Sequence, residues 1–112
     1  IDEDEIANYG GSGHWVQDGN GWWYSYDTGG YPSSCWKQIN GAWYHFNSSG
    51  YMQTGWLKLD GQWFYLADSG AMLTGWQAIN GKWYYLGTDG VMYEDTWTPD
   101  GFYVNGSGVW VQ

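Results

Sequence analysis

The side chains best suited to chemistry in this sequence are aromatic rings. The 112 residues include eleven Trp and eleven Tyr, and aromatic residues make up 22% of the chain. The face of such a ring attracts a cation that lies over it, most strongly when the ring is Trp. Rings can also stack on sugars or fill a core that is poor in Leu and Ile. The spacing of the rings along the chain helps to distinguish cation binding, sugar stacking and core packing.

The Trp residues recur with a period of 20 residues, which is typical of a repeat protein. Each repeat holds two of them: Trp36 and Trp43, Trp56 and Trp63, Trp76 and Trp83. A Gly and a Met follow at fixed positions: Gly50 and Met52, Gly70 and Met72, Gly90 and Met92. An earlier, variant copy has a longer turn: Trp15, Trp23, Tyr24, Gly30, and Pro32 in the Met position. A degenerate closing copy contains Trp97, Gly101 and Tyr103.

Turn signals divide each repeat into two strands. Asn40-Gly41, Asp60-Gly61 and Asn80-Gly81 each lie between runs of aromatic and aliphatic residues. Such pairs favour two-residue hairpin turns, in which both central residues have positive φ. No segment shows the 3.6-residue periodicity of a helix. The sequence therefore predicts an all-β fold, a solenoid of stacked β-hairpins built from repeats of about 20 residues.

A two-residue turn also fixes which side chains share a face. With Asn80-Gly81 as the turn, Trp76 pairs with Tyr85 and Ala78 pairs with Trp83. Trp76 and Trp83 then lie diagonally on one face, while Tyr84 points the other way. The same argument places Trp36 with Trp43, and Trp56 with Trp63. The next repeat must cover these aromatic faces, because an isolated hairpin is marginally stable in water.

Charge and hydropathy argue against two classes of partner. The formal net charge is −9 and the pI is near 4.1, with only Lys37, Lys58 and Lys82 as basic residues. Nucleic-acid binding depends on basic residues that neutralise phosphates, so we expect no nucleic-acid partner. No apolar run reaches the ~20 residues of a membrane span, so we expect no membrane insertion. The first residues lack the positively charged and apolar regions of a signal peptide, so we expect none within this segment.

The chain is predicted to be one repeat domain behind a short tail. Residues 1–13 are interpreted as an acidic N-terminal tail or linker, and 14–112 as the repeat solenoid. The predicted repeats cover about 14–34, 35–54, 55–74 and 75–94, with a closing unit at 95–112. The only cysteine, Cys35, replaces the Gly of other repeats, which excludes an intrachain disulfide and suggests a small space-filling residue.

Catalytic and metal sites find little support in the sequence. The acidic residues of the repeats occur near loops and turns, without the paired inward carboxylates of a glycosidase: Asp27, Asp68, Asp89, Glu94 and Asp95. His14, His45 and Cys35 lack zinc-ligand spacing. We therefore predict that the chain is not an enzyme and has no metal and no cofactor.

The motif Gly-Trp-x4-Gly-x-Trp-Tyr/Phe-x5-Gly-x-Met resembles the choline-binding, or cell-wall-binding, repeats of Gram-positive surface proteins and phage lysins. The resemblance covers roughly residues 14–112. It implies a β-solenoid in which cages of aromatic rings between consecutive repeats hold choline. The implied partner is choline or phosphocholine on cell-wall teichoic acid. The implied location is extracellular and associated with the cell wall.

In that family a cage takes both Trp of one repeat, the aromatic residue after the hairpin Trp of the next, and often that repeat's Met. Carried over, the first cage is Trp15, Trp23, Tyr44 and Met52. The second cage is Trp36, Trp43, Phe64 and Met72. The third cage is Trp56, Trp63, Tyr84 and Met92. A fourth cage needs Trp76 and Trp83 with a ring at Val104, and is incomplete unless Tyr103 or Phe102 substitutes.

Three other interpretations remain open at this point. The Trp pairs could form only a hydrophobic core, and the Met residues are interpreted as packing residues that contact a ligand secondarily. Similar aromatic repeats bind glucans or other carbohydrates through ring faces. The notches between repeats could also receive a second chain, which makes the protein a structural or homo-oligomeric solenoid.

Overall fold

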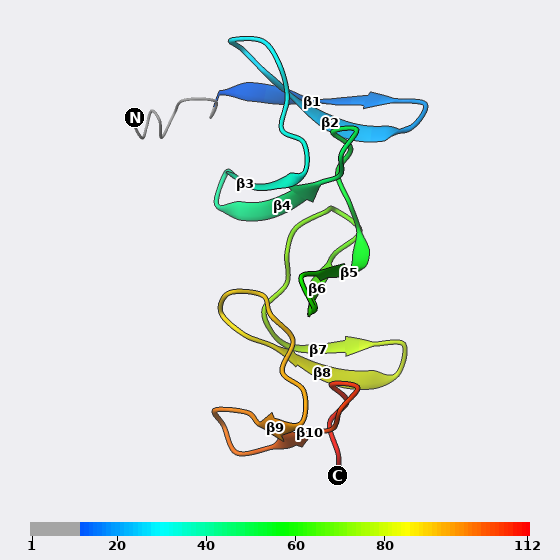
Figure 1. Cartoon of the computed structure of the whole chain (residues 1–112), viewed down its shortest axis with the longest axis vertical. Coiled ribbons are helices and arrows are strands. Elements are labelled where there is room, and N and C mark those ends of the chain that lie inside the picture. The colour runs from blue at the N-terminus through cyan, green and yellow to red at the C-terminus, as the bar shows by residue number, and fades with distance from the viewer. Residues whose placement is uncertain (1–11) are drawn as a thin grey trace. The chain divides into compact units, whose positions relative to one another are not determined.

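A computed structural model of the protein describes residues 12–112, which form five two-stranded antiparallel sheets (Figure 1). None of the described residues is helical, and no membrane-spanning helix is found among them. The prediction of an all-β fold made of successive hairpins is confirmed. The proposed acidic tail, 1–13, lies almost entirely outside the described residues. The chain divides into two compact units, Ile1–Gln53 and Thr54–Gln112.

The first unit contains two hairpins around a small aromatic core. Its strands are β1 (Gly13–Asp18), β2 (Gly21–Tyr26), β3 (Cys35–Ile39) and β4 (Ala42–Phe46). Strand β1 pairs with β2, and β3 pairs with β4. Tyr24, Ile39 and Phe46 are buried together, with Trp15 and Met52 packed against them. Aromatic residues thus form the larger part of this core cluster.

The second unit contains three hairpins. Its strands are β5 (Gly55–Leu59), β6 (Gln62–Leu66), β7 (Gly75–Ile79), β8 (Lys82–Leu86), β9 (Thr96–Trp97) and β10 (Tyr103–Val104). The pairs are β5 with β6, β7 with β8, and β9 with β10. Equivalent positions of the three hairpins hold fully buried residues: Leu66, Leu86 and Val104.

The turns have the predicted backbone conformation. Asn40, Asp60 and Asn80 have φ values of 51°, 50° and 51°, and the glycines that follow them have φ values above 80°. This double positive φ matches the right-handed twist of the flanking strands. The predicted register of β7 and β8 is confirmed, because Trp76 pairs with Tyr85 and Ala78 pairs with Trp83.

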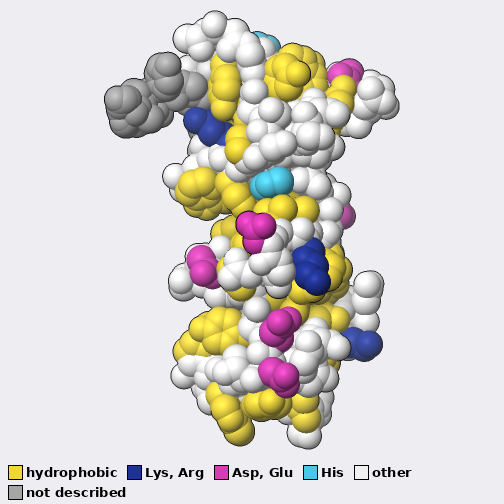
Figure 2. All heavy atoms as spheres, viewed as in Figure 1, with side chains coloured by type: hydrophobic (Ala, Val, Ile, Leu, Met, Phe, Trp, Pro, Cys, Tyr) yellow, Lys and Arg dark blue, Asp and Glu magenta, His cyan; other side chains and the backbone are white. Residues whose placement is uncertain are grey.

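Within each compact unit, a backbone hydrogen bond at the hairpin Trp joins consecutive hairpins. The Trp carbonyl accepts from an N–H in the loop that follows the next hairpin. The three bonds are Met52 to Trp22 (2.7 Å), Met92 to Trp63 (2.8 Å) and Trp110 to Trp83 (2.9 Å). This bond brings the residue after each hairpin beside the Trp of the preceding one. Hydrophobic side chains remain at the surface on the face shown in Figure 2.

Candidate functional site

The residues predicted for the third cage surround a cavity. Trp56 lies edge-on to Trp63, with ring centroids 6.0 Å apart, and edge-on to Tyr84, with centroids 4.9 Å apart. The two interplanar angles are 86° and 71°, so the rings form a concave wall. Trp56, Trp63, Tyr84 and Met92 line a cavity of about 410 Å³, within the ~300–1,000 Å³ range of small-molecule sites.

The strand register explains why these rings converge. Trp56 pairs with Tyr65, and Lys58 pairs with Trp63, so the two Trp side chains are diagonal neighbours on one face of the β5–β6 hairpin. The ring of Tyr65 supports Trp56 from within the same hairpin, at 4.9 Å. Tyr84 comes from the next hairpin, on the face opposite to Trp83. The third cage is therefore built by two consecutive repeats.

Met92 packs beneath the cavity as well as lining it. Its exposed fraction is 8%, and its backbone N–H donates to Trp63. Its sulfur lies so close to Gly108 that a Cβ there would approach it to 2.5 Å. Gly108 also has a φ of +82°, which L side chains rarely adopt. These contacts agree with the interpretation of the Met residues as packing residues.

Charged groups of both signs lie at the third cage. Glu94 completes the cavity wall together with Gly106 and Ser107. The Lys58 ammonium lies over the Trp63 ring, with Nζ 5.6 Å from the centroid. The sequence argument assigned neither residue to a site. A carboxylate at the rim favours a cationic ligand, whereas the Lys58 ammonium opposes one.

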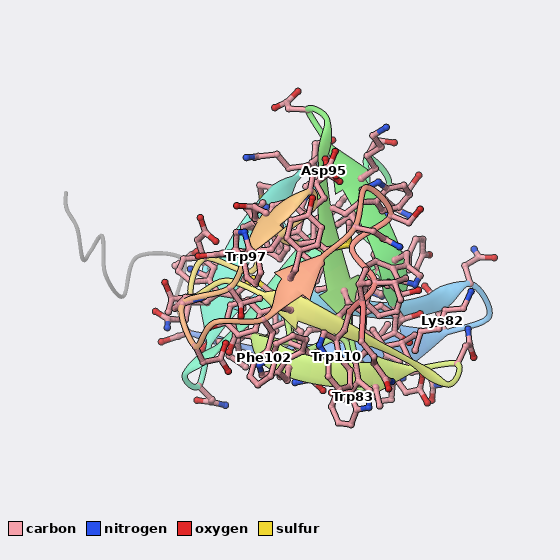
Figure 3. All side chains as sticks on the ribbon, turned by 90° about the horizontal axis from the view of Figure 1, so that it is seen from below. Lys82, Trp83, Asp95, Trp97, Phe102 and Trp110 are labelled. Atoms are coloured by element: carbon pink, nitrogen blue, oxygen red, sulfur yellow. The ribbon has the colours of Figure 1, made fainter. Side chains whose placement is uncertain are left out.

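A second cavity, of about 360 Å³, forms the fourth cage. It is lined by Trp76, Trp83, Phe102, Trp110 and Asp100. Trp76 is edge-on to Phe102 and to Trp110, with centroid distances of 5.9 Å and 6.4 Å. In Figure 3, Trp83, Phe102 and Trp110 lie on one side of the closing unit, away from Trp97 and Asp95. The fourth cage therefore has four rings, and it does not depend on position 104.

The third ring is Phe102 because the closing hairpin is shorter than the others. Tyr103 pairs with Trp97, six positions earlier, whereas Tyr85 pairs with Trp76, nine positions earlier. The 20-residue offset from Tyr84 therefore leads to Val104, which is fully buried in the core. Tyr103 does not line the cavity: its ring packs on Trp97 at 5.2 Å. Of the two substitutes considered, the structure brings Phe102 to the cage.

Asp100 links two parts of the fourth cage by hydrogen bonds. Its Oδ2 accepts a hydrogen bond of 2.9 Å from Trp76 Nε1, and its Oδ1 accepts one from the Thr98 hydroxyl. Thr98 Oγ1 in turn accepts the backbone N–H of Phe102 at 3.1 Å. The hydrogen bonds from Thr98 and Trp76 hold the pKa of Asp100 below its ordinary value, and the carboxylate is ionised at neutral pH.

In the first hairpin, the register places Trp22, and not the predicted Trp23, beside Trp15. Trp15 pairs with Tyr24 and Gln17 pairs with Trp22, which places Trp22 diagonally beside Trp15. Trp23 pairs with Val16 and lies on the opposite face. Tyr44 approaches Trp15 as predicted, with ring centroids 5.0 Å apart. The assignment of Trp23 to the first cage was therefore wrong by one position.

The extra residue of the first repeat lies after its hairpin. The loop between β1 and β2 has two residues, like the later hairpin loops. The Gly29 N–H donates to the carbonyl of Tyr26, three residues before it. The Gly50 N–H makes the same bond with the carbonyl of Asn47 in the next repeat. A Cβ on Gly50 would meet the Tyr31 ring at 2.5 Å, so Tyr31 packs where the other repeats use Met. Gly29 and Tyr31 thus hold the positions predicted for Gly30 and Pro32.

Comparisons with known proteins agree with this geometry. Two models of the choline-binding repeat match residues 33–74 and 74–110. The structure of the choline binding domain of Spr1274 from Streptococcus pneumoniae is 44% identical, with a TM-score of 0.66. The match covers 72% of this chain and 98% of that domain. This chain belongs to the choline-binding repeat family. A comparison with the curated proteins found no significant match.

Longer members of the choline-binding repeat family are also similar. Choline binding protein F of Streptococcus pneumoniae, solved with a peptidoglycan analogue, is 38% identical with a TM-score of 0.84. The match covers 90% of this chain and 34% of that protein. The cell wall endolysin of phage Cp-1, solved with choline, is 32% identical with a TM-score of 0.70 over 89% of this chain. This chain spans 37% of the endolysin's length.

The remaining residues singled out in the sequence of these choline-binding repeats are those of the second cage, His45 and Cys35. The members of the second cage are divided between the two units, so that cage stays a prediction from the sequence. His45 is buried, is hydrogen-bonded to Gln53, and supports Trp36 edge-on at 5.0 Å, as Tyr65 supports Trp56. Cys35 is exposed. Across residues 12–112, no cluster of His, Cys, Asp and Glu suited to a metal ion is found.

Proposed function

We propose that this chain is a non-catalytic, cell-wall-binding module that holds choline, or the choline end of phosphocholine, of teichoic acid in its aromatic cages. The third cage carries the proposal. Trp56, Trp63 and Tyr84 meet at steep angles around one cavity, and such an arrangement surrounds a compact cation. Sugar stacking needs a flatter ring platform, so the geometry favours choline over a glucan. The proposed location is the cell surface.

The chemistry of trimethylammonium suits these cages. The group has a diffuse positive charge and no N–H donor, so ring faces can both attract the cation and cover its methyl groups. Each ring contributes roughly 0.5–2 kcal/mol, depending on how much water is excluded. After the entropic costs of association, one cage is expected to bind free choline with Kd on the order of 1 mM.

Attachment to a polymer would then depend on several cages acting together. When linked sites meet a polymer that repeats its choline groups, avidity can exceed the single-site affinity by ~10²–10⁴. The first, third and fourth cages each lie within one unit and would contribute separately. The net charge of −9 also attracts a cationic ligand at long range, although physiological salt screens this beyond about 8 Å.

A titration with choline tests the proposal. Choline is added to the whole chain while Trp fluorescence and the indole N–H signals in NMR spectra are recorded, and a glucan oligosaccharide is titrated in parallel. We expect saturable changes at Trp56 and Trp63 in the millimolar range of choline. No response at tens of millimolar choline, beside a response to the glucan, would contradict it. Assembly that depends on protein concentration but on neither ligand would favour the structural interpretation.

A further inference from the structure

The fourth cage differs from the third in having a carboxylate fixed at its wall. Asp100 lines the cavity with Trp76, Trp83, Phe102 and Trp110. Its two oxygens accept hydrogen bonds from Trp76 Nε1 and from the Thr98 hydroxyl, and Thr98 is only 4% exposed. Because one donor is a ring of the cage and the other is buried in the closing hairpin, the carboxylate has a defined place beside the rings.

The bound carboxylate retains capacity to accept further hydrogen bonds. An ionised carboxylate has about four acceptor positions, and the side chains of Trp76 and Thr98 occupy two of those of Asp100. An aspartate is already ionised at neutral pH, and the same hydrogen bonds lower the pKa of Asp100 further. A ligand inside the cage therefore meets a negative charge and a free acceptor position as well as four ring faces.

Such an acceptor matters for only some methylated ammonium groups. Trimethylammonium has no N–H, so it gains only the general electrostatic attraction of the carboxylate. Dimethylammonium keeps one N–H, and placing that donor among apolar rings without an acceptor is unfavourable. A carboxylate at the wall removes this penalty and adds a charge-assisted hydrogen bond. A cage of rings alone discriminates against the N–H, whereas a cage with a fixed carboxylate accepts it.

The third cage offers the matched comparison. Its carboxylate belongs to Glu94, which is exposed like Asp100. Within residues 12–112, however, the structure shows no hydrogen bond that fixes Glu94, whereas Asp100 accepts two. A long, exposed side chain loses rotamer freedom when it binds a ligand. Glu94 therefore contributes charge near the cavity, and it holds no acceptor in place.

We propose that Asp100 is a specificity-determining residue, which allows the fourth cage to bind dimethylammonium groups as well as the trimethylammonium of choline. This inference rests on the proposed function, because it assumes that the cages hold methylated ammonium groups. The fourth cage would then bind a wider range of methylated ammonium groups than the third cage. Polymers with incompletely methylated choline groups would then be held by this end of the module.

The test compares choline with N,N-dimethylethanolamine, its analogue with one methyl group fewer. Both are titrated into the whole chain, and the indole N–H signals of Trp56 and Trp76 report the third and fourth cages separately. We expect the ratio of the Kd for the dimethyl compound to the Kd for choline to be lower at the fourth cage. Asp100→Asn should raise that ratio about three- to tenfold, the range of one net hydrogen bond. Glu94→Gln, the matched control, should change the third-cage ratio by less than about twofold.

The outcomes separate the two proposals. A ratio at the fourth cage that Asp100→Asn leaves unchanged, while choline still binds there, overturns the role of Asp100. Choline binding at the third cage with neither ligand at the fourth also overturns it. No binding at either cage overturns the proposed function itself. If Asp100→Asn loses the fold of the closing unit, Asp100→Glu gives the same test, since it moves the carboxylate by one methylene and should also raise the ratio.

Discussion

Trp83→Ala is expected to weaken the fourth cage and to leave the third cage intact. Trp83 lines the fourth cavity, and its ring is 45% exposed. Removing one ring of a cation cage should cost about 0.5–2 kcal/mol, which is roughly a 2- to 30-fold rise in Kd for choline. Tyr84, which serves the third cage, lies on the opposite face of the same hairpin, so its position should not change.

The effect of Trp83→Ala on the fold should be small, since partly exposed residues outside the core contribute little to stability. We expect the thermal midpoint to fall by less than about 8 °C, corresponding to about 1 kcal/mol. The assay is a choline titration followed at the indole signals of Trp76 and Trp56. Trp97→Ala is the matched control, because Trp97 is 65% exposed, packs on Tyr103 and lines neither cavity. Equal weakening by both substitutions, or loss of the third cage in Trp83→Ala, would refute the register argument.

Three further predictions concern the core, a like charge and pH. Leu86→Ala removes a fully buried side chain and should lower the free energy of unfolding by about 2–5 kcal/mol in a denaturant titration; a loss below about 1 kcal/mol would contradict its place in the core. Lys58→Gln removes an ammonium held over a third-cage ring, so choline affinity there should rise by up to about threefold; unchanged or weaker binding would contradict this. Hydrogen bonds from the Asn20 amide and the Tyr51 hydroxyl lower the pKa of Asp18 below 3.8, so its contribution to stability is present above that pH and is lost as pH falls through the lowered pKa. Asp18→Asn should remove this acid-dependent loss in melting curves recorded from pH 6 to pH 2, and an unchanged curve would count against the assignment.

The later repeats could be predicted from local signals because their turns leave little freedom. An Asn-Gly or Asp-Gly pair between alternating strands fixes the turn type, and the turn type fixes the register. The faces of Trp56, Trp63 and Tyr84 followed from that register alone, and the structure brings these rings around one cavity. The Met residues could also be placed, since each follows the hairpin at a constant distance.

Both ends of the array were harder to predict, because they depart from the constant period. In the first repeat, Trp22 and Trp23 are adjacent, and either could be the hairpin Trp. The prediction placed the extra residue in the turn, and it therefore selected Trp23 in place of Trp22. A comparison of Trp15 with Trp36 at an offset of 21 would have aligned Trp22 with Trp43. In the closing unit, the shortened hairpin moves the third ring from position 104 to Phe102. No turn signal like Asn-Gly marks that deletion.

The role of Asp100 could not have been read from the sequence. Its importance depends on three groups that meet only in the folded chain: the Trp76 indole from β7, the Thr98 hydroxyl beside β9, and the Phe102 backbone N–H beside β10. In the sequence, Asp100 is one acidic residue among twelve. Loop carboxylates of this kind are usually solvated and carry no structural information until their hydrogen-bond partners are known.

The backbone hydrogen bond from a hairpin Trp to the following repeat, present at Trp22, Trp63 and Trp83, has a consequence for how such arrays change length in evolution. Because a cage belongs to the junction of two neighbours, inserting one whole repeat within the array adds one junction and disturbs no other. The closing unit is different: it has Gly101 in place of a hairpin Trp, so it completes the cage before it and cannot begin another. Duplications are therefore expected among the repeats that keep a hairpin Trp, because a second copy of the unit with Gly101 could not begin a cage.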